Sequence, residues 1–272
     1  MSGPFDPAPA KPQDGLCWVT GASSGIGEKL VERLVKTGWT VAVTARSEDK
    51  LKALEAAHPG KVIAAPADIS DAEAVKAAVE RLESEHGPIA RAILNAGIYI
   101  PIELPDARFE DYAKTFAVNL NGTAACLCAI TPRMAERQSG QIAIVSSATA
   151  FGGMPTASAY GASKAALVNM AEACRVELHR HGVLIQAVTP GFVDTPAQED
   201  NAFPKPFMIT ADVAAKRIVS GLKTRRFEIT FPRRFTWMLK LIYALPRDWH
   251  INLVRKQTGW NKPASSQKDD QP

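Results

Sequence analysis

Two side chains with proton-transfer chemistry stand four residues apart in a segment whose pattern predicts a helix. Tyr160 and Lys164 therefore project from one face of residues 158–181. A phenol normally has a pKa of about 10, too high for easy proton exchange at neutral pH. A neighbouring ammonium stabilises the phenolate and lowers that pKa, so the pair can serve as a general acid and base. The alternative is an ordinary surface contact within a helix.

A glycine-rich turn near the start of the chain has the character of a phosphate cradle. The run Thr20-Gly-Ala-Ser-Ser-Gly-Ile-Gly27 follows an apolar segment, and a helical pattern begins directly after it. Small residues let the backbone approach a pyrophosphate, and a helix N-terminus offers free N–H groups. The spacing is G-x-x-x-G-x-G instead of the common G-x-G-x-x-G. The residues predicted to hold a dinucleotide here are Gly21, Ser23, Ser24, Gly25, Ile26 and Gly27. The alternative is a turn that only connects strand and helix.

The residue after the second apolar segment bears on which dinucleotide binds. In a dinucleotide fold this position faces the adenine ribose, where a carboxylate favours NAD and a guanidinium favours the 2′-phosphate of NADP. The chain has Arg46 there, with Lys50 close by in sequence. We therefore expect NADP rather than NAD, the alternative being a solvated surface arginine.

These residues lie between regularly alternating elements. Strands are expected at 16–20, 40–45, 62–65, 92–95, 142–146, 184–189 and 228–231, and helices at 25–37, 47–57, 71–86, 109–136, 158–181 and 211–223. Repeated β-α-β units mean parallel strands, and uniformly apolar strands indicate a sheet covered on both faces. The expected fold is α/β, a three-layer doubly wound parallel sheet of the Rossmann type over residues 15–231, as a single domain with a helical C-terminal extension.

Taken together, the motifs resemble the short-chain dehydrogenase/reductase superfamily in its common single-domain form. The resemblance covers about residues 15–222. Its pieces are the glycine turn, Asp68, Asn95-Ala-Gly97, Asn119, Ser146-Ser147, Tyr160-Gly-Ala-Ser-Lys164 and Pro190-Gly191. Each piece is weak alone, but all of them in order at the family's spacing make a specific pattern.

The resemblance implies an NADP-dependent oxidoreductase that moves a hydride between nicotinamide and a ketone or secondary alcohol. Tyr160 would give its proton to the carbonyl oxygen, and Ser147 would hold that oxygen. Ser147 is preferred to Ser146 because it precedes the tyrosine by thirteen residues, the family's usual spacing. Lys164 would also bind the nicotinamide ribose, and Asn119 would position a water beside Lys164. The alternative is a non-catalytic cofactor-sensing or scaffold protein, although such proteins usually lack the tyrosine or the lysine.

Other positions resemble the family's cofactor contacts. They are Asp68 and Ile69 beside the adenine, Asn95, Ala96 and Gly97 on the adenosine side, and Pro190, Gly191, Val193 and Thr195 along the nicotinamide and its phosphate. Turn chemistry alone also explains a proline and glycines. The four cysteines form no C-x-x-C pair, so we expect no metal site and reduced thiols in a cytoplasmic protein. Family members often form homodimers or homotetramers through the helices at 109–136 and 158–181.

The loops at the carboxyl ends of the strands should meet the substrate, and they are apolar. They carry Ile98, Tyr99, Ala148, Phe151, Met154, Phe192, Phe203, Phe207 and Met208. This composition favours a hydrophobic ketone or alcohol, unless half of these side chains only pack the lid that residues 195–211 are expected to form over the site.

Charge is unevenly distributed along the 272 residues. The chain is 46% hydrophobic and 22% charged, which excludes a disordered chain, and its net charge is +4. Residues 216–256 hold eleven cations and two carboxylates, so this segment carries +9 and the rest of the chain −5. We expect flexible tails at 1–14 and 261–272.

Residues 232–260 mix aromatic and basic side chains and predict a basic amphipathic helical extension. Residues 232–256 could lie on a membrane surface, and similar tails occur in superfamily members that act on long-chain lipids. The alternative is a helix pair packed on the protein's own body or on a second subunit, with its cations in water. We expect no nucleic-acid binding, since no recognition module accompanies the cations.

Overall fold

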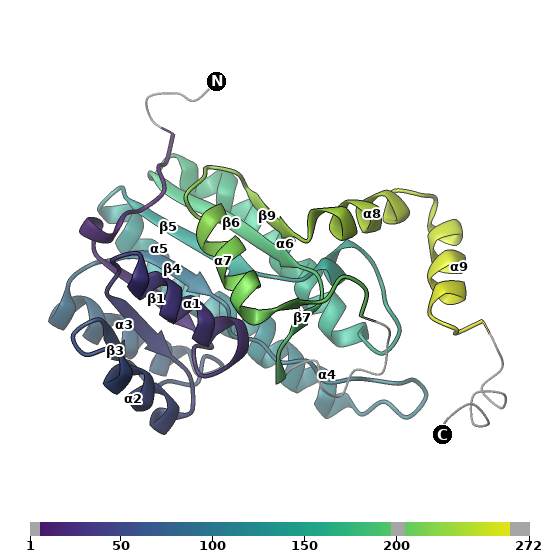
Figure 1. Ribbon diagram of the computed structural model, residues 1–272, viewed down its shortest axis with the longest axis horizontal. Coiled ribbons are helices and arrows are strands. Elements are labelled where there is room, and N and C mark those ends of the chain that lie inside the picture. Colours follow the sequence, from purple (N-terminus) through teal and green to yellow (C-terminus); the bar gives the residue numbers. More distant parts are fainter. Residues whose placement is uncertain (1–5, 197–204, 262–272) are drawn as a thin grey trace.

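A parallel sheet of seven strands forms the centre of the computed structural model, which describes residues 6–196 and 205–261 (Figure 1). The strands are β1 Leu16–Thr20, β2 Val41–Thr44, β3 Val62–Ala64, β4 Ile89–Leu94, β5 Gly140–Val145, β6 Val183–Pro190 and β9 Glu228–Phe231. Their order is β3-β2-β1-β4-β5-β6-β9, and every neighbouring pair is parallel. The predicted doubly wound α/β fold is confirmed.

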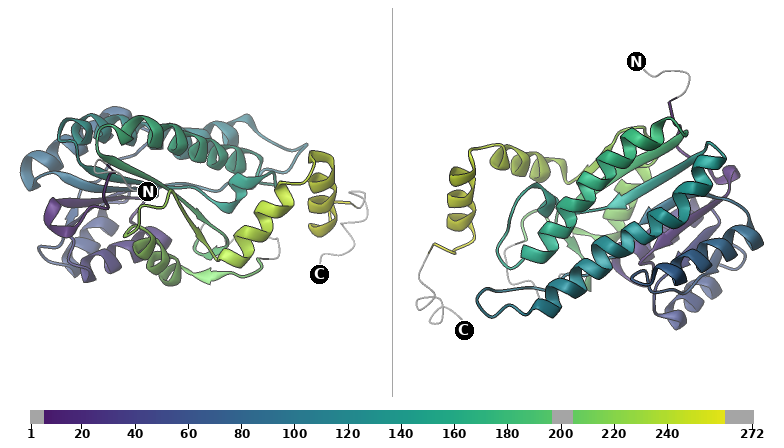
Figure 2. Two further views of the ribbon diagram at one scale, coloured as in Figure 1. Left: turned by 90° about the horizontal axis from the view of Figure 1, so that it is seen from above. Right: turned by 180° about the vertical axis from the view of Figure 1, so that it is seen from behind.

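Helices cover both faces of the sheet, as the side view in Figure 2 shows. They are α1 Gly25–Lys36, α2 Glu48–Ala57, α3 Ala72–His86, α4 Phe109–Phe116, α5 Gly122–Glu136, α6 Ser158–His179 and α7 Ala211–Gly221. Alternate residues of a strand enter different cores: Cys17 packs towards α1, α2 and α7, whereas Trp18 packs towards α3, α5 and α6. Burial on both faces explains why the strands are apolar throughout.

The strand order reverses its direction between β1 and β4, the strands at the centre of the sheet. Crossovers from these two strands run to opposite sides, which leaves a crevice outside their carboxyl ends. The loops that follow β1 to β6 therefore meet at one edge of the sheet.

One expected helix differs from the sequence-based prediction. Residues 109–136 form α4 and α5 with a π-helical turn, Ala117–Asn121, between them. Such turns are frequent at functional sites. Two short strands that we did not predict, β7 Val193–Asp194 and β8 Ile209–Thr210, pair with each other below the carboxyl edge.

The expectation of a flexible tail over residues 1–14 is wrong for residues 6–14, and residues 1–5 lie outside the described part. Ala10 N donates to Gln141 Oε1 at 3.0 Å, and the Ala10 carbonyl accepts from the buried Arg91 guanidinium at 2.5 Å. The same guanidinium donates to Gln141 Oε1 at 2.8 Å and lies 4.5 Å from the Trp39 ring centroid. A buried cation needs such partners, so it fixes the segment in place.

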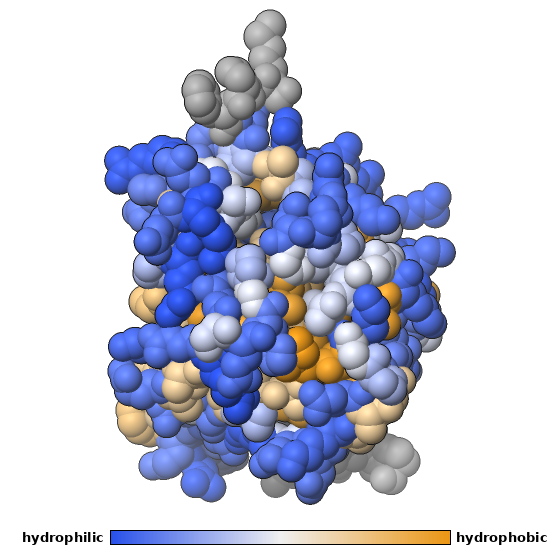
Figure 3. Space-filling view, turned by 90° about the vertical axis from the view of Figure 1, so that its left-hand side faces the viewer, coloured by the Kyte–Doolittle hydropathy of each residue, from blue (hydrophilic) through white to orange (hydrophobic). Residues whose placement is uncertain are grey.

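The predicted C-terminal extension is helical. Its helices are α8 Arg233–Tyr243 and α9 Arg247–Gln257, and they project beyond the β9 edge of the sheet (Figures 1 and 2). The expected tail at 261–272 lies outside the described residues apart from Asn261. Among the described residues, no helix has both the length and the apolar character needed to cross a membrane. The opposite end of the molecule, at α2 and β3, is largely hydrophilic (Figure 3).

The Arg91 cluster leads to a stability prediction. Gln141→Leu removes the acceptor of Arg91 and of Ala10 N, and it also removes a 2.6 Å bond to Gln186. The free energy of unfolding in urea should fall by about 2–4 kcal/mol, because a buried guanidinium loses a partner. Gln13→Leu, at an exposed position of the same N-terminal segment, should stay within about 0.5 kcal/mol of wild type. Equal stability of the two variants would contradict this role of Gln141.

Candidate active site

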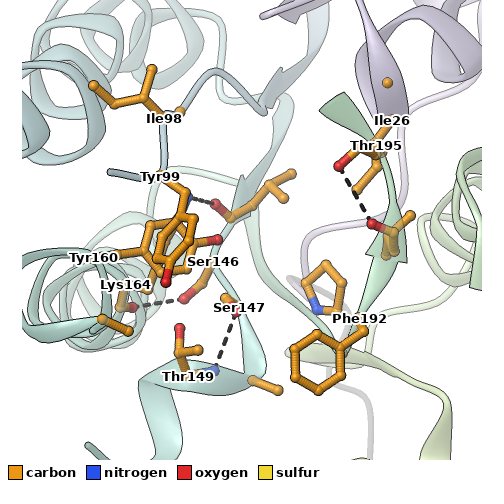
Figure 4. Close-up of a pocket in the computed structure, with 18 of the residues that line it drawn as sticks. Ile26, Ile98, Tyr99, Ser146, Ser147, Thr149, Tyr160, Lys164, Phe192 and Thr195 are labelled. Atoms are coloured by element: carbon orange, nitrogen blue, oxygen red, sulfur yellow. Dashed lines mark hydrogen bonds between the residues drawn. The ribbon is translucent and has the colours of Figure 1, made fainter. Parts of the chain in front are cut away.

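A cleft of about 1200 Å³ opens at the carboxyl edge of the sheet. Figure 4 shows Tyr99, Tyr160, Lys164 and Ser147 on one side of it, with Ile26, Thr195 and Phe192 on the other. The predicted site residues that line it are Gly21, Ser23, Ser24, Gly25, Ile26, Arg46, Asp68, Ile69, Asn95, Ala96, Gly97, Ser147, Tyr160, Lys164, Pro190, Gly191, Val193 and Thr195. Gly27 and Asn119 are buried and do not line the cleft.

The glycine turn leaves no room for side chains on its inner side. Gly21 has a φ of +66°, and a Cβ there would lie 2.7 Å from Ala96 Cα. A Cβ on Gly27 would lie 2.0 Å from the Gly21 oxygen. Asn95 Nδ2 donates to the carbonyls of Thr20 and Gly21 at 3.1 and 3.2 Å, so this side chain holds the turn itself.

The turn fits a dinucleotide phosphate. The helix α1 begins at Gly25, and the side chain of its N-cap residue, Ser24, makes no capping hydrogen bond. The first N–H groups of α1 are thus available to an anion, and the dipole of the helix favours negative charge there. The cleft wall at this point is backbone and small side chains, as a close approach of pyrophosphate requires.

A cationic group lies further along the same end of the cleft. Arg46 and Lys50 line it together with Asp68. Hydrogen bonds from the backbone and hydroxyl of Ser70 lower the pKa of Asp68, and the nearby charge of Arg46 lowers it further. Arg46 therefore lies close enough to Asp68 to affect its charge, and both face the region expected for an adenosine.

The predicted catalytic residues Ser147, Tyr160 and Lys164 lie together on one side of the cleft (Figure 4). Burial raises the pKa of Tyr160 to about 12, although a hydrogen bond with Ser147 opposes the rise. The ring of Tyr99 packs edge-on against it at 5.2 Å between centroids. Burial lowers the pKa of Lys164 to about 8, and its Nζ donates to the Val145 carbonyl at 3.0 Å.

The expected lowering of the phenol's pKa by the lysine is wrong for this structure. Lys164 Nζ lies 5.6 Å from the centroid of the Tyr160 ring, on its face. Removal of both groups from water disfavours the phenolate and the ammonium alike, and this outweighs their attraction. The phenol of Tyr160 consequently keeps its proton at neutral pH.

The two adjacent serines have different surroundings. Ser146 is buried, and its Oγ donates to the backbone carbonyl of Lys164 at 2.7 Å. Ser147 is half-buried and lines the cleft, and its Oγ accepts from Thr149 N at 3.2 Å. The hydroxyl proton of Ser147 is thereby left for another acceptor. Of the two, Ser147 thus has the hydroxyl that is free to donate into the cleft, whereas the Ser146 hydroxyl holds α6 to the sheet.

Asn119 lies in the π-helical turn behind Gly97. Its Oδ1 accepts from Ile98 N at 2.8 Å, and its Nδ2 donates to the Ile98 carbonyl at 2.9 Å and to Ser163 Oγ at 3.1 Å. A Cβ on Gly97 would lie 3.2 Å from both Asn119 Oδ1 and Lys164 Nζ. Asn119 therefore lies beside the lysine and fixes the backbone of the loop after β4. Its action through a water stays a prediction.

The substrate half of the cleft contains residues that sequence reasoning missed. Those from the extension are Phe235, Met238, Leu239, Ile242, Tyr243, Leu253, Val254, Gln257 and Thr258. The sequence shows these residues spaced by three and four along two predicted helices. This spacing does not indicate which surface the apolar face packs against. Thr149 also lines the cleft, and its Oγ1 is a buried side-chain oxygen without a hydrogen-bond partner in the described part.

Only some of the loop residues expected to contact a substrate line the cleft. Ile98, Tyr99, Ala148, Met154 and Phe192 line the cleft. Phe151 instead packs against Lys240, with Nζ 5.0 Å from its ring centroid. Phe207 and Met208 are exposed, and Phe203 lies outside the described residues.

Similarity to known proteins assigns the chain to a family. A family model described as short chain dehydrogenase matches residues 16–204. The chain belongs to the short-chain dehydrogenase family. An "uncharacterized oxidoreductase" of Myxococcus xanthus is 32% identical to this dehydrogenase over 231 residues, which cover 84% of this chain and 91% of the relative. The 3-oxoacyl-acyl-carrier-protein reductase FabG of Thermotoga maritima is 33% identical over 187 residues, covering 68% and 76%.

Solved structures share the fold of this short-chain dehydrogenase. One, described as a short-chain dehydrogenase of Novosphingobium aromaticivorans, has a TM-score of 0.75 at 22% identity and covers 94% of this chain and 92% of its own. A closed form of serine dehydrogenase complexed with NADP+ has a TM-score of 0.72 at 22% identity, with 79% and 94% covered.

The buried ammonium leads to a prediction about pH. Lys164 has a pKa of about 8 in the fold against 10.5 in an unfolded chain. Between these values the unfolded state binds more protons, so the stability of wild type should rise with pH. Relative to Lys164→Met, the rise should approach about 3 kcal/mol between pH 7 and pH 10.5. Urea unfolding of both proteins without cofactor measures it, and a stability difference that is constant across this range would refute the assignment.

Proposed function

We propose that this short-chain dehydrogenase transfers a hydride between NADP(H) and a hydrophobic ketone or secondary alcohol. One observation carries the proposal: Ser147, Tyr160 and Lys164 meet at one end of a cleft whose other end is a glycine cradle beside Arg46. The bound nicotinamide supplies or accepts the hydride. Every other step belongs to side chains of this chain.

Tyr160 and Ser147 act on the carbonyl oxygen. The neutral phenol donates its proton to that oxygen during reduction, and its raised pKa keeps the proton available at neutral pH. The Ser147 hydroxyl, whose oxygen already accepts from Thr149 N, donates to the same oxygen. Both hydroxyls are thus placed to stabilise negative charge as it develops. Lys164 lies next to the phenol and Asn119 next to Lys164, which supports the roles that the family resemblance implies.

The preference for NADP rests on the cations at the adenosine end. Arg46 and Lys50 line the cleft there, and a guanidinium matches a phosphate with two parallel hydrogen bonds. The serine dehydrogenase with the same fold was solved with NADP+. Asp68 faces the same region, but its carboxylate already accepts two hydrogen bonds from Ser70.

A hydrophobic substrate fits the opposite half of the cleft. Among the described residues, the charged side chains that line the cleft are Arg46, Lys50, Asp68 and Lys164, and none of them lies on the walls built by α8 and α9. Those walls offer aliphatic and aromatic side chains. The relative FabG is named for the reduction of a 3-oxoacyl group, a ketone on an acyl chain, which agrees with this class of reaction. We further propose a cytoplasmic homodimer or homotetramer assembled through α4, α5 and α6.

Replacement of Tyr160 by phenylalanine tests the proton donor. Tyr160→Phe should lower kcat for NADPH-dependent ketone reduction by about 100- to 10,000-fold, because the general acid is lost while the ring remains. The dissociation constant of NADPH, measured by fluorescence titration, should change less than about threefold. Rates of the two proteins that are equal on every ketone reduced by wild type would favour the non-catalytic scaffold alternative.

Replacement of Arg46 tests the cofactor. Arg46→Ala should lower kcat/KM for NADPH by about 10- to 100-fold and leave that for NADH nearly unchanged, since only the former has a 2′-phosphate. Lys52→Ala is the matched control, because Lys52 pairs with Glu48 on α2 and does not line the cleft. Equal losses with both cofactors in Arg46→Ala would assign the arginine to the fold instead.

A further inference from the structure

The helix α8 presents two apolar sides, whereas α9 presents one apolar side with exposed apolar side chains on its flanks. The cleft is lined by Met238, Leu239 and Ile242 of α8 and by Leu253 and Val254 of α9. Four further large apolar side chains do not line the cleft. Two lie on the opposite side of α8 and two on the flanks of α9, and together they define the outer side of these helices. They are Trp237, Leu241, Trp249 and Ile251, which are 59%, 69%, 67% and 56% exposed. Exposed apolar side chains gathered in two adjacent helices favour a site of interaction.

The helix α8, which carries Trp237 and Leu241, is firmly attached to the body of the protein. Phe235 of α8 is buried against Gly191, and a Cβ on this glycine would lie 2.8 Å from the phenylalanine ring. The ring of Tyr243 packs against Gly152 in the same way. The Tyr243 hydroxyl donates to the Gly153 carbonyl at 3.1 Å. Lys240 forms an ion pair with Glu228 of β9. The body of the protein therefore holds α8 with its outer side towards solvent.

The charge around the outer side is strongly positive. Residues 233–257 contain six cations and a single carboxylate, Asp248, and their net charge is +5. The cations are Arg233, Arg234, Lys240, Arg247, Arg255 and Lys256. Of these, Lys240 is the one with an ion pair in the described part of the chain, and the other five are exposed. Exposed tryptophans among cations are typical of helices that lie in a membrane interface.

We propose that the outer side of α8 and α9 binds the surface of an anionic lipid bilayer. Lipid phosphates would neutralise the exposed cations while the four apolar side chains enter the interface. A second copy of this chain is a poorer occupant, because a two-fold contact would bring two segments of +5 together. Since the same helices form a wall of the cleft, a lipophilic ketone would pass from the bilayer into the cleft along them. This delivery step rests on the proposed function, whereas the binding to lipid does not.

Co-sedimentation of the full chain with vesicles tests the binding without any turnover. Wild type should bind vesicles of phosphatidylcholine with phosphatidylglycerol at least tenfold more tightly than vesicles of phosphatidylcholine alone, and salt should weaken the binding. Leu241→Glu/Trp249→Glu should weaken it at least tenfold. Arg255→Gln/Lys256→Gln should weaken it about fivefold for each cation removed. These positions are exposed, so circular dichroism should show unchanged folding.

A control adds the same two charges elsewhere. Ala53→Glu/Ala56→Glu changes exposed positions of α2, at the hydrophilic end of the molecule, and should bind within twofold of wild type. Failure of wild type to bind either vesicle would overturn the proposal, as would equal weakening by this control. So would a wild-type dimer in light scattering that Leu241→Glu/Trp249→Glu dissociates, with vesicle binding absent, since a second copy would then cover the helices.

Delivery is tested by presenting ketones in two ways. Leu241→Glu/Trp249→Glu should lose about tenfold in the reduction of a long-chain ketone held in anionic vesicles and keep wild-type rates on a short water-soluble ketone. Equal loss on both ketones would overturn the delivery step. If wild type reduces no ketone but still binds anionic vesicles, the proposed function fails and the lipid surface stands.

Discussion

The buried ammonium of Lys164 ties α6, the helix that carries the proposed proton donor, to the end of the sheet. Its Nζ donates to the carbonyl of Val145, the last residue of β5, at 3.0 Å, and Ser146 Oγ donates to the backbone carbonyl of Lys164 at 2.7 Å. Residue 164 is thus held twice at the point where β5 ends. Tyr160 lies one turn earlier on α6, beside Ser147. A shift of α6 along the sheet would break both bonds and separate the phenol from the serine.

The same burial that holds these groups also determines their protonation. Burial raises the pKa of Tyr160 to about 12 and lowers that of Lys164 to about 8, so the phenol keeps its proton and the lysine stays close to titration. Part of the wall that surrounds the site comes from α8, through Phe235 and Tyr243. The C-terminal extension therefore forms part of the wall of the cleft, although it follows the last strand of the sheet and lies outside the matched family region.

Sequence reasoning succeeded where the signal is local. The strands of the β-α-β units are short apolar runs, and small residues mark the turn at Gly21. The fold and the glycine-rich phosphate cradle could therefore be predicted. It failed where the cause is distant. Ala10 bonds to Gln141 and Arg91, far away along the chain, and no periodicity in the N-terminal segment indicates this. The direction of the pKa shift of Tyr160 depends on burial by several elements, which the spacing to Lys164 alone does not contain.

The binding of a hydrophobic ketone in this cleft is read most directly from kcat/KM for NADPH-dependent reduction of methyl ketones of increasing chain length. Each methylene that enters an apolar cleft contributes about 0.8 kcal/mol, so kcat/KM should rise about fourfold per methylene until the cleft is filled. Ile242→Ala, which removes part of the α8 wall, should flatten the rise at the longer chains. A kcat/KM that does not change with chain length, or that is highest for short polar ketones, would contradict a hydrophobic substrate at this site.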